Sequence, residues 1–244
     1  MATDERWRLE PLLVGDDRAL RHTSSSVALC FGLGPATGHG VDEERLHRVT
    51  DALGLDGAAW LRQEHGTRLV RVSSRSSVPV SCAGNGDGLI TSERGLALAV
   101  WTADCVPVLL AASAVVAAVH AGWRGTAAGI VPLAVQHLLQ LTHGRPETIT
   151  ASLGPAICGR HYQVGLEVID ALAAADVDEQ CWRNGDHVDL RTFITAQLLK
   201  LGVTDIRTVD RCTYSDPELA SYRRDGAAAG RQWSLVALTP TRPS

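Results

Sequence analysis

The sequence predicts an α+β fold in which layers of strands and helices share one domain. Three apolar runs at residues 96–102, 106–110 and 114–119 follow one another closely, and such continuous apolarity is typical of strands covered on both faces. Helical periodicity occurs elsewhere without a regular alternation with strands, which argues against a doubly wound parallel sheet. No internal repeat or low-complexity linker divides the chain, so we expect residues 1–244 to form a single domain.

The remaining elements follow in chain order. Residues 1–58 form a weakly specified leader, with a strand expected at 27–31 and a helix at 41–53. A serine-rich loop at 73–77 and a glycine-rich turn cluster at 84–88 follow. Extended runs predict further strands at 60–63, 68–72, 148–153, 206–209 and 233–238. Apolar residues at helical spacing predict helices at 125–141, 166–175 and 190–201.

The composition restricts the function classes. A formal charge of −4, with 45% hydrophobic and 20% charged residues, excludes disorder and nucleic-acid binding driven by net charge. The chain has a single lysine, Lys200, in a helix-like segment without the glycines of a phosphate loop. Lysine chemistry therefore has no plausible residue, and arginine is the practical ligand for a phosphate group.

The cellular location is expected to be the cytoplasm. Charged residues interrupt the N-terminal region, so no signal-peptide core is formed. The longest apolar run, 105–119, contains Pro107 and falls short of the roughly 20 residues that a membrane-spanning helix needs. We expect no membrane partner and no nucleic-acid partner, and the sequence does not indicate an oligomeric state.

Three residues that can bind metal share one local pattern. His65, Cys105 and His120 each lie at the end of an expected strand, beside a glycine or a tight turn, so the fold can bring them to one edge. Two histidines and a cysteinate form a plausible three-ligand zinc site whose fourth position stays open, as in catalytic zinc sites. The alternative from the residues alone is two satisfied histidines and a buried thiol.

The other cysteines carry no such pattern. The chain has six, at positions 30, 82, 105, 158, 181 and 212, and none forms a C-x-x-C pair. In a cytosolic protein, a cysteine of this kind is expected to behave as a small buried hydrophobic residue. Cys158 is treated as structural on this ground.

Charged residues beside these positions indicate an anion site. Asp104 stands in an apolar stretch, where an unpaired carboxylate would cost several kcal/mol, so it must be paired, turned into a cavity, or functional. Arg124 lies next to an expected helix start, which favours anion binding. Arg223, Arg224 and Arg231 form either a solvated charged run or a fork for phosphate or carboxylate.

Several metalloenzyme classes fit the sequence poorly. A blue-copper centre usually adds a weak axial methionine, and Met1 is the only methionine. A multicopper oxidase needs many paired histidines, but no two of the nine histidines stand at H-x-H spacing. The H-x-E and P-C-x-x-C signature of cytidine deaminases is absent from the sequence.

At these positions the chain resembles the YfiH family, a group labelled multicopper polyphenol oxidase or laccase domain. The resemblance covers about residues 60–238, and the leader 1–58 matches weakly. The motifs that carry it are Gln63-Glu64-His65-Gly66-Thr67, Gly86-Asp87-Gly88, Ala103-Asp104-Cys105-Val106-Pro107, His120-Ala121-Gly122-Trp123-Arg124-Gly125-Thr126, Gly154-Pro155-Ala156-Ile157, Tyr162-Gln163-Val164-Gly165 and Ser221-Tyr222-Arg223-Arg224-Asp225-Gly226. Residues 21–26 lack the arginine-containing stretch usual in the family, and Gln163 replaces a usual glutamate.

The resemblance implies a layered α/β/β/α sandwich, also found in cytotoxic necrotizing factor deamidases. It implies zinc, with copper as the alternative, held by His65, Cys105 and His120. It further implies phosphorolysis of adenosine, inosine or methylthioadenosine, together with adenosine deamination. The leading hypothesis is therefore a zinc enzyme that takes a nucleoside and phosphate, with Asp104 supporting the site and phosphate held by Arg124, Arg223, Arg224 or Arg231.

Other hypotheses remain open from the sequence. A Cys105/His120 thiol hydrolase or amidase would act on a cell-wall precursor, and its thiol would need a pKa below the usual value of about 8.5. A copper-dependent polyphenol oxidase is the second alternative. A zinc-stabilised binding module without catalysis is the third.

Overall fold

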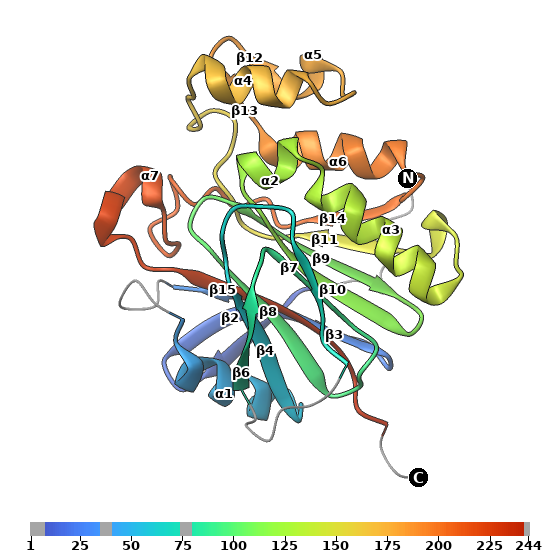
Figure 1. Ribbon diagram of the computed structural model, residues 1–244. Helices are drawn as coiled ribbons and strands as arrows, with labels where there is room; N and C mark the ends of the chain where they lie inside the picture. The colour runs from blue at the N-terminus through green and yellow to red at the C-terminus, as the bar shows by residue number, and fades with distance from the viewer. Residues whose placement is uncertain (1–7, 35–40, 74–79, 242–244) are drawn as a thin grey trace.

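Two β-sheets stacked face to face form the centre of the molecule, and helices cover their outer faces (Figure 1). The computed structural model describes residues 8–34, 41–73 and 80–241. The expected serine-rich loop at 73–77 lies outside these ranges except for its first residue.

Seven strands form the first sheet within the described ranges. In spatial order they are β1 (Glu10–Val14), β2 (Asp17–Thr23), β3 (Val27–Leu33), β15 (Gln232–Leu238), β8 (Leu96–Thr102), β4 (Gly57–Arg62) and β6 (Val80–Asn85). β3 pairs antiparallel with β15, so the expected leader joins the C-terminal strand in one sheet. β4 and β8 pair parallel, so their carboxyl ends lie at the same edge.

The second sheet has six strands among the residues described. Their order is β14 (Asp205–Thr208), β11 (Thr150–Leu153), β9 (Val106–Ala112), β10 (Val115–Ala121), β7 (Gly88–Thr91) and β5 (Leu69–Arg71). β9 and β10 form an antiparallel hairpin that sets His120 opposite Pro107. β11 and β14 pair parallel, so the loops that follow them also leave the sheet on the same side.

Helices cover each sheet on one side. They are α1 (Glu43–Ala52), α2 (Trp123–Ala127), α3 (Ile130–Thr142), α4 (Leu166–Ala173), α5 (Glu179–Trp182), α6 (Leu190–Lys200) and α7 (Tyr222–Asp225), with a small hairpin of β12 (Arg183–Asn184) and β13 (His187–Val188). α4 and α5 lie beyond α2 and α6, at the top of Figure 1. None of the helices in the described part of the chain is long and apolar enough to cross a membrane.

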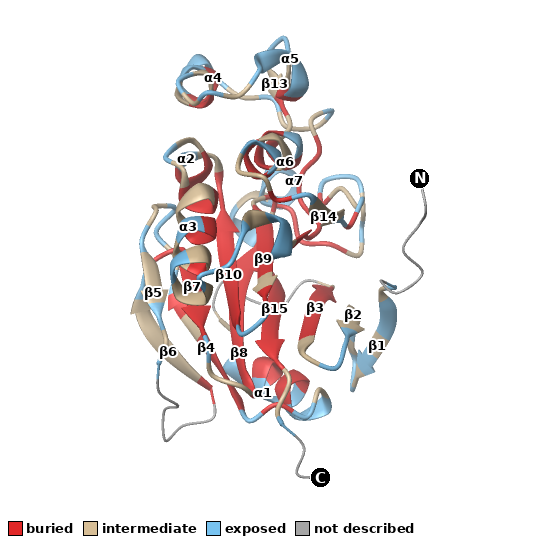
Figure 2. Cartoon of the chain, turned by 90° about the vertical axis from the view of Figure 1, so that its right-hand side faces the viewer, coloured by how far each residue is buried: buried red, intermediate tan, exposed pale blue. Residues whose placement is uncertain are grey.

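Three buried apolar layers hold these elements together. Between the sheets, residues such as Phe31 from the first sheet and Leu109 from the second share one cluster. α1 packs Leu46 against the outer face of the first sheet. α3 and α6 pack Ile130 and Phe193 against the second sheet. Figure 2 shows the central strands β8, β9, β10 and β15 largely buried and β1 exposed at a sheet edge. The expected α/β/β/α layering is confirmed.

Three expectations differ from the structure. The helix expected at 125–141 is divided into α2 and α3, because Gly129 adopts a left-handed φ of 83° between them, a conformation open to glycine. The cluster at 84–88 is expected as a turn, but β6 and β7 extend into both of its ends. The segment 1–58, expected to be weakly specified, contains β1, β2 and β3, which pair in sequence along the first sheet.

Candidate metal centre

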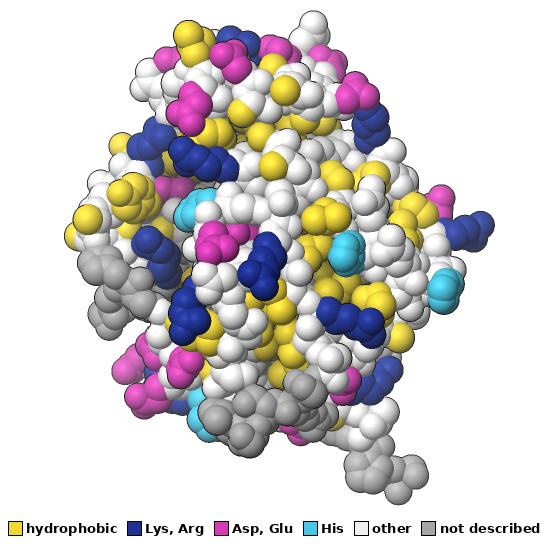
Figure 3. Space-filling model, in the orientation of Figure 1, with side chains coloured by type: hydrophobic (Ala, Val, Ile, Leu, Met, Phe, Trp, Pro, Cys, Tyr) yellow, Lys and Arg dark blue, Asp and Glu magenta, His cyan; other side chains and the backbone are white. Residues whose placement is uncertain are grey.

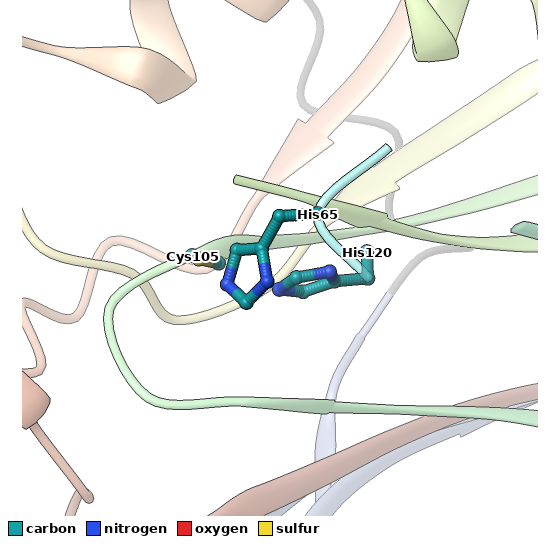
Figure 4. Close-up of side chains that lie close together, drawn as sticks. All are labelled: His65, Cys105 and His120. Carbon is teal, nitrogen blue, oxygen red and sulfur yellow. The ribbon is translucent and has the colours of Figure 1, made fainter. Parts of the chain in front are cut away.

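His65, Cys105 and His120, called the first cluster below, meet where the two sheets end. His65 lies in the turn after β4 and Cys105 in the turn between β8 and β9. Because β4 and β8 run parallel in adjacent positions, both turns lie at one edge. His120 comes from β10, opposite Pro107, and its ring lies 4.7 Å from that of His65 between centroids, at an interplanar angle of 85° (Figure 4). One ligand atom from each of the three residues lies within 4.8 Å of the other two.

Asp87 orients the ring of His120 and holds the backbone of His65. Its side chain is 0% exposed, and its Oδ1 accepts hydrogen bonds from His120 Nδ1 at 2.8 Å and from the His65 backbone N–H at 2.9 Å. Oδ2 accepts from the Gly66 N–H at 2.7 Å. Burial opposes ionisation, but the bond from His120 and those from the backbone outweigh it and hold the pKa of Asp87 below its usual value. When the His120 ring is neutral, as metal binding requires, an ionised Asp87 keeps its proton on Nδ1 and leaves the Nε2 lone pair free.

Cys105 and His120 shift each other's pKa in opposite directions. Burial opposes the thiolate, but the charge of His120 and the hydrogen bonds from His120 and His65 lower the pKa of Cys105 to about 6. Burial likewise opposes the imidazolium, but the Cys105 thiolate and then Asp87 raise the pKa of His120 to about 9. The cluster therefore supplies a thiolate at neutral pH, which is the form that binds a metal ion.

The backbone below the first cluster leaves room for an ion. A Cβ atom at Gly122 would stand 3.1 Å from Cys105 Sγ and 3.0 Å from His65 Cδ2. Only glycine lets the chain pass this close to two of the three side chains. One thiolate and two imidazoles suit zinc, and the carboxylate behind His120 is the usual partner of a metal-binding histidine. The residues present therefore fit a zinc ion.

The first cluster lines a cavity of about 660 Å³. Aromatic side chains form much of its wall: Trp60, Trp101, Trp123, Tyr162 and Tyr222. Four arginines also line it: Arg62, Arg124, Arg223 and Arg231. In Figure 3, basic side chains lie near α7 and also on the right half of the face shown. A cavity with these walls can hold a flat ring system and an anion together.

Asp104 is paired, as the sequence requires of a carboxylate in this stretch. It is 9% exposed and lines the cavity, and its backbone adopts a φ of 90°. Its Oδ1 accepts from Thr213 Oγ1 at 2.5 Å and its Oδ2 from the Arg223 N–H at 2.7 Å. Asp104 thus ties the turn of Cys105 to α7.

The four expected anion ligands separate into two groups. Arg124, Arg223 and Arg231 line the cavity, and the Arg124 guanidinium lies 4.1 Å from the Trp123 ring centroid. Arg224 is not among the lining residues. Its guanidinium donates to the carbonyl oxygens of Thr213, Tyr214, Asp216 and Leu219 and to the carboxylate of Asp225. Arg224 therefore holds the loop before α7 in place.

Sequence reasoning missed three residues of the site. Asp87 stands in the motif Gly86-Asp87-Gly88, and a carboxylate between two glycines at the start of an apolar strand could have indicated a buried partner. Arg62 precedes the motif that contains His65 and gave no separate signal. Tyr162, whose ring lies 5.1 Å from the Arg223 guanidinium, stands in a turn motif that does not mark it as a site residue.

The chain is similar in sequence to known proteins. Residues 37–239 match the family model described as multi-copper polyphenol oxidoreductase laccase. The chain belongs to this family. It is 36% identical to a purine nucleoside phosphorylase of Deinococcus radiodurans, over 93% of each chain. It is 42% identical to one of Mycobacterium tuberculosis, over 78% of this chain and 76% of the relative. The resemblance expected from the motifs is confirmed.

Solved structures of the same family share the fold. YlmD from Geobacillus stearothermophilus superposes with a TM-score of 0.80 at 25% identity, covering 91% of this chain and 96% of its own. YfiH from Bacillus licheniformis gives a TM-score of 0.77 at 25% identity, covering 87% and 93%. These matches show that the layered fold is that of the family.

Proposed function

We propose that this protein is a zinc-dependent purine nucleoside phosphorylase that converts adenosine, inosine or methylthioadenosine and phosphate to the free base and the corresponding sugar 1-phosphate, which is ribose 1-phosphate for adenosine and inosine and 5-methylthioribose 1-phosphate for methylthioadenosine. The observation that carries the proposal is the first cluster at the wall of a cavity that aromatic and arginine side chains also line. The names of the curated relatives support the same activity. A location in the cytoplasm, where nucleosides and phosphate meet, belongs to the proposal.

Zinc is the proposed metal, and His65, Cys105 and His120 would hold it. When bound, zinc supplies a Lewis acid at neutral pH. Asp87 keeps the His120 ring in the orientation and tautomer that ligation needs. Copper is the alternative metal that the family description suggests, and metal analysis of the purified protein separates the two.

The arginines are the proposed phosphate ligands. Arg124, Arg223 and Arg231 can neutralise a phosphate dianion and present an oxygen to the ribose C1′. The new C1′–O bond forms as the C1′–N9 bond breaks, and the purine leaves with the bonding electrons and takes up a proton. Positive charge develops on the sugar in this step, so the Asp104 carboxylate at the cavity wall would favour it.

The aromatic wall is the proposed purine site. A flat heterocycle gains dispersion energy and excludes water when it lies against aromatic rings such as Trp123 and Tyr162. The same cavity is proposed to deaminate adenosine, a reaction in which water replaces the 6-amino group and ammonia leaves. Both activities would use one purine orientation with different attacking groups.

Product analysis tests the proposal. Purified protein is incubated with each nucleoside, with and without phosphate, and the products are separated by chromatography. We expect free base and the corresponding sugar 1-phosphate only when phosphate is present, and inosine from adenosine in its absence. A protein with its zinc bound that yields none of these products contradicts the proposed function.

A thiol hydrolase or amidase is the second candidate, because Cys105, His120 and Asp87 also form a thiol–imidazole–carboxylate chain. Its substrate would be an amide such as one in a cell-wall precursor. The metal separates the two candidates, since zinc on Cys105 occupies the sulfur. Hydrolysis by zinc-free protein that is blocked by alkylation of Cys105 would favour this candidate.

A further inference from the structure

A second group of thiols and imidazole lies outside the cavity of the first cluster. Cys158, His161 and Cys212, called the second cluster below, have ligand atoms that all lie within 4.8 Å of one another. His161 Nδ1 is 3.3 Å from Cys158 Sγ and 3.4 Å from Cys212 Sγ. Cys158 is buried, as expected of a structural cysteine, but His161 and Cys212 beside it also form a set of metal-ligand donors with it.

The fold builds this second cluster from two adjacent loops. Cys158 follows β11 and Cys212 follows β14, and these two strands pair in parallel, so both loops leave the sheet on the same side. A backbone bridge then joins Ala156 to Cys212, with the Thr213 N–H donating to the Ala156 carbonyl at 3.1 Å. The two cysteines are thus held in register by backbone hydrogen bonds that do not depend on their sulfur atoms.

The spacing of the donor atoms matches a tetrahedral ion. With zinc bonds of about 2.3 Å to sulfur and 2.0–2.1 Å to nitrogen, the sulfur and nitrogen atoms of a tetrahedral site stand about 3.5 Å apart. The two sulfur–nitrogen distances in the second cluster are 3.3 and 3.4 Å. His161 is also oriented by stacking on Tyr214, with ring centroids 4.8 Å apart at an interplanar angle of 27°. The imidazole therefore keeps Nδ1 directed at both sulfur atoms.

The surroundings also favour a thiolate and an open route for a metal ion. The Cys158 N–H donates to Cys212 Sγ at 3.3 Å, which stabilises negative charge on that sulfur. Cys158 lines a separate cavity of about 680 Å³, whose lining does not include any residue of the first cluster. An ion can reach Cys158 through this cavity.

We propose that Cys158, His161 and Cys212 form a second metal site, specific for a soft divalent ion of the zinc class. Two thiolates and one imidazole are donors that zinc prefers over magnesium or calcium, and they leave one position for a water molecule. The ion neutralises the two thiolates and ties the loop after β11 to the loop after β14.

This tie would reach the cavity of the first cluster through two neighbouring residues. Tyr162, which follows His161, lines that cavity, and Thr213, which follows Cys212, donates to Asp104. Residues of the second cluster are thus the immediate chain neighbours of Tyr162, which lines the cavity, and of Thr213, which donates a hydrogen bond to Asp104. We assign it a positioning role, since its own side chains do not line that cavity.

Zinc stoichiometry tests the second site. The protein is stripped of metal, equilibrated with a zinc salt under reducing conditions, desalted, and its zinc content is measured by mass spectrometry. We expect about two zinc ions per chain for the wild-type protein and about one each for Cys105→Ser, Cys158→Ser and His161→Gln. Cys181→Ser, which changes an exposed cysteine outside both clusters, serves as the control and should keep both ions.

A labelling experiment on the wild-type protein covers the case in which a variant fails to fold. Iodoacetamide should alkylate Cys158 and Cys212 in the metal-free protein, and zinc should slow both reactions at least tenfold while leaving Cys181 unaffected. The proposal is overturned if the wild-type protein holds one zinc ion per chain and Cys105→Ser holds none. Equal labelling of Cys158 and Cys212 with and without zinc also overturns it, as does an intact mass showing that the two cysteines form a disulfide under these conditions.

Discussion

The two clusters contain similar donors but occupy different surroundings. The first cluster joins one thiol and two imidazoles, and a fully buried Asp87 fixes one ring. The second cluster joins two thiols and one imidazole, and no hydrogen bond among the described residues links His161 to a carboxylate. The first cluster lines a cavity with four arginines and five aromatic side chains, whereas the cavity beside the second has three arginines, Arg160, Arg183 and Arg191, and Trp182 in its lining.

This contrast shows that a donor set alone does not define a catalytic centre. Both clusters can offer thiolate and imidazole to a metal ion, but all three residues of the first cluster line their cavity, whereas of the second cluster only Cys158 lines the cavity beside it. The clusters also differ in support: the Asp87 carboxylate sets the tautomer of His120, whereas no carboxylate among the described residues is hydrogen-bonded to His161. Substitutions in each cluster test whether the two have different roles.

Loss of a ligand in the first cluster should have the largest effect. Cys105→Ser or His120→Ala removes one donor, and phosphorolysis should fall by more than the roughly 10²-fold that loss of a supporting residue costs. Initial rates of base release and zinc content per chain measure the outcome. Circular dichroism confirms that the variant is folded, and a folded variant that keeps wild-type rates would remove the first cluster from the reaction.

Asp87→Asn should have the next largest effect. The amide keeps the size of the side chain but loses the charge that holds the His120 proton on Nδ1. Zinc affinity and turnover should fall about 10- to 100-fold. Competition with a chelator measures the affinity. The control is His161→Gln in the second cluster, which should leave the zinc affinity of the first cluster unchanged. An Asp87→Asn protein with unaltered zinc affinity would contradict the positioning role.

Two adjacent arginines give a matched pair. Arg223→Gln removes a cavity-lining charge, so KM for phosphate should rise about tenfold, equivalent to about 1.4 kcal/mol. Arg224→Gln removes the bonds to the loop before α7, so the free energy of unfolding should fall by about 2 kcal/mol. Steady-state kinetics and urea unfolding of both variants separate the roles. Equal effects on KM would place both arginines at the phosphate, as the sequence alone allowed.

The pH dependence of thiol reactivity gives the smallest effect. The Cys105 pKa of about 6 means that its thiolate predominates above this pH in the metal-free protein and is protonated as the pH falls through it. Alkylation of Cys105 at pH 6 should therefore proceed at about half its rate at pH 8, once the rates are corrected for the reagent. Peptide mass spectrometry follows each cysteine separately. A rate that keeps rising up to pH 9 would show that His120 does not stabilise the thiolate.

Much of the fold was predictable because continuous apolar runs mark strands buried on both faces. The expected strand at 96–102 matches β8, and those at 106–110 and 114–119 match β9 and β10 within two residues at each end. The strands β1 and β2 were missed because they lie at the sheet edge, where half-exposed residues such as Arg18 and Arg21 dilute the pattern. Tertiary pairing with β3, not local sequence, places them in the sheet.

The site was predictable where its residues lie next to glycine or proline residues, which mark the ends of strands and turns in the sequence. His65, Cys105 and His120 each adjoin a glycine or proline motif, and they do lie together. The different roles of the neighbouring residues Arg223 and Arg224 were not predictable from the sequence. They depend on the conformation of the loop before α7, whose carbonyl oxygens accept hydrogen bonds from Arg224. The grouping of Cys158 and His161 with Cys212 depends on parallel pairing of β11 and β14, which no local pattern shows.

The central claim is that the first cluster carries the reaction and the second cluster supports the fold around it. The most direct test compares ribose 1-phosphate formation from inosine and phosphate by zinc-equilibrated wild-type protein, Cys105→Ser and Cys158→Ser, each at saturating substrate. We predict no product above background from folded Cys105→Ser and measurable turnover from folded Cys158→Ser. Full activity of Cys105→Ser, or its loss in Cys158→Ser alone, would contradict the claim.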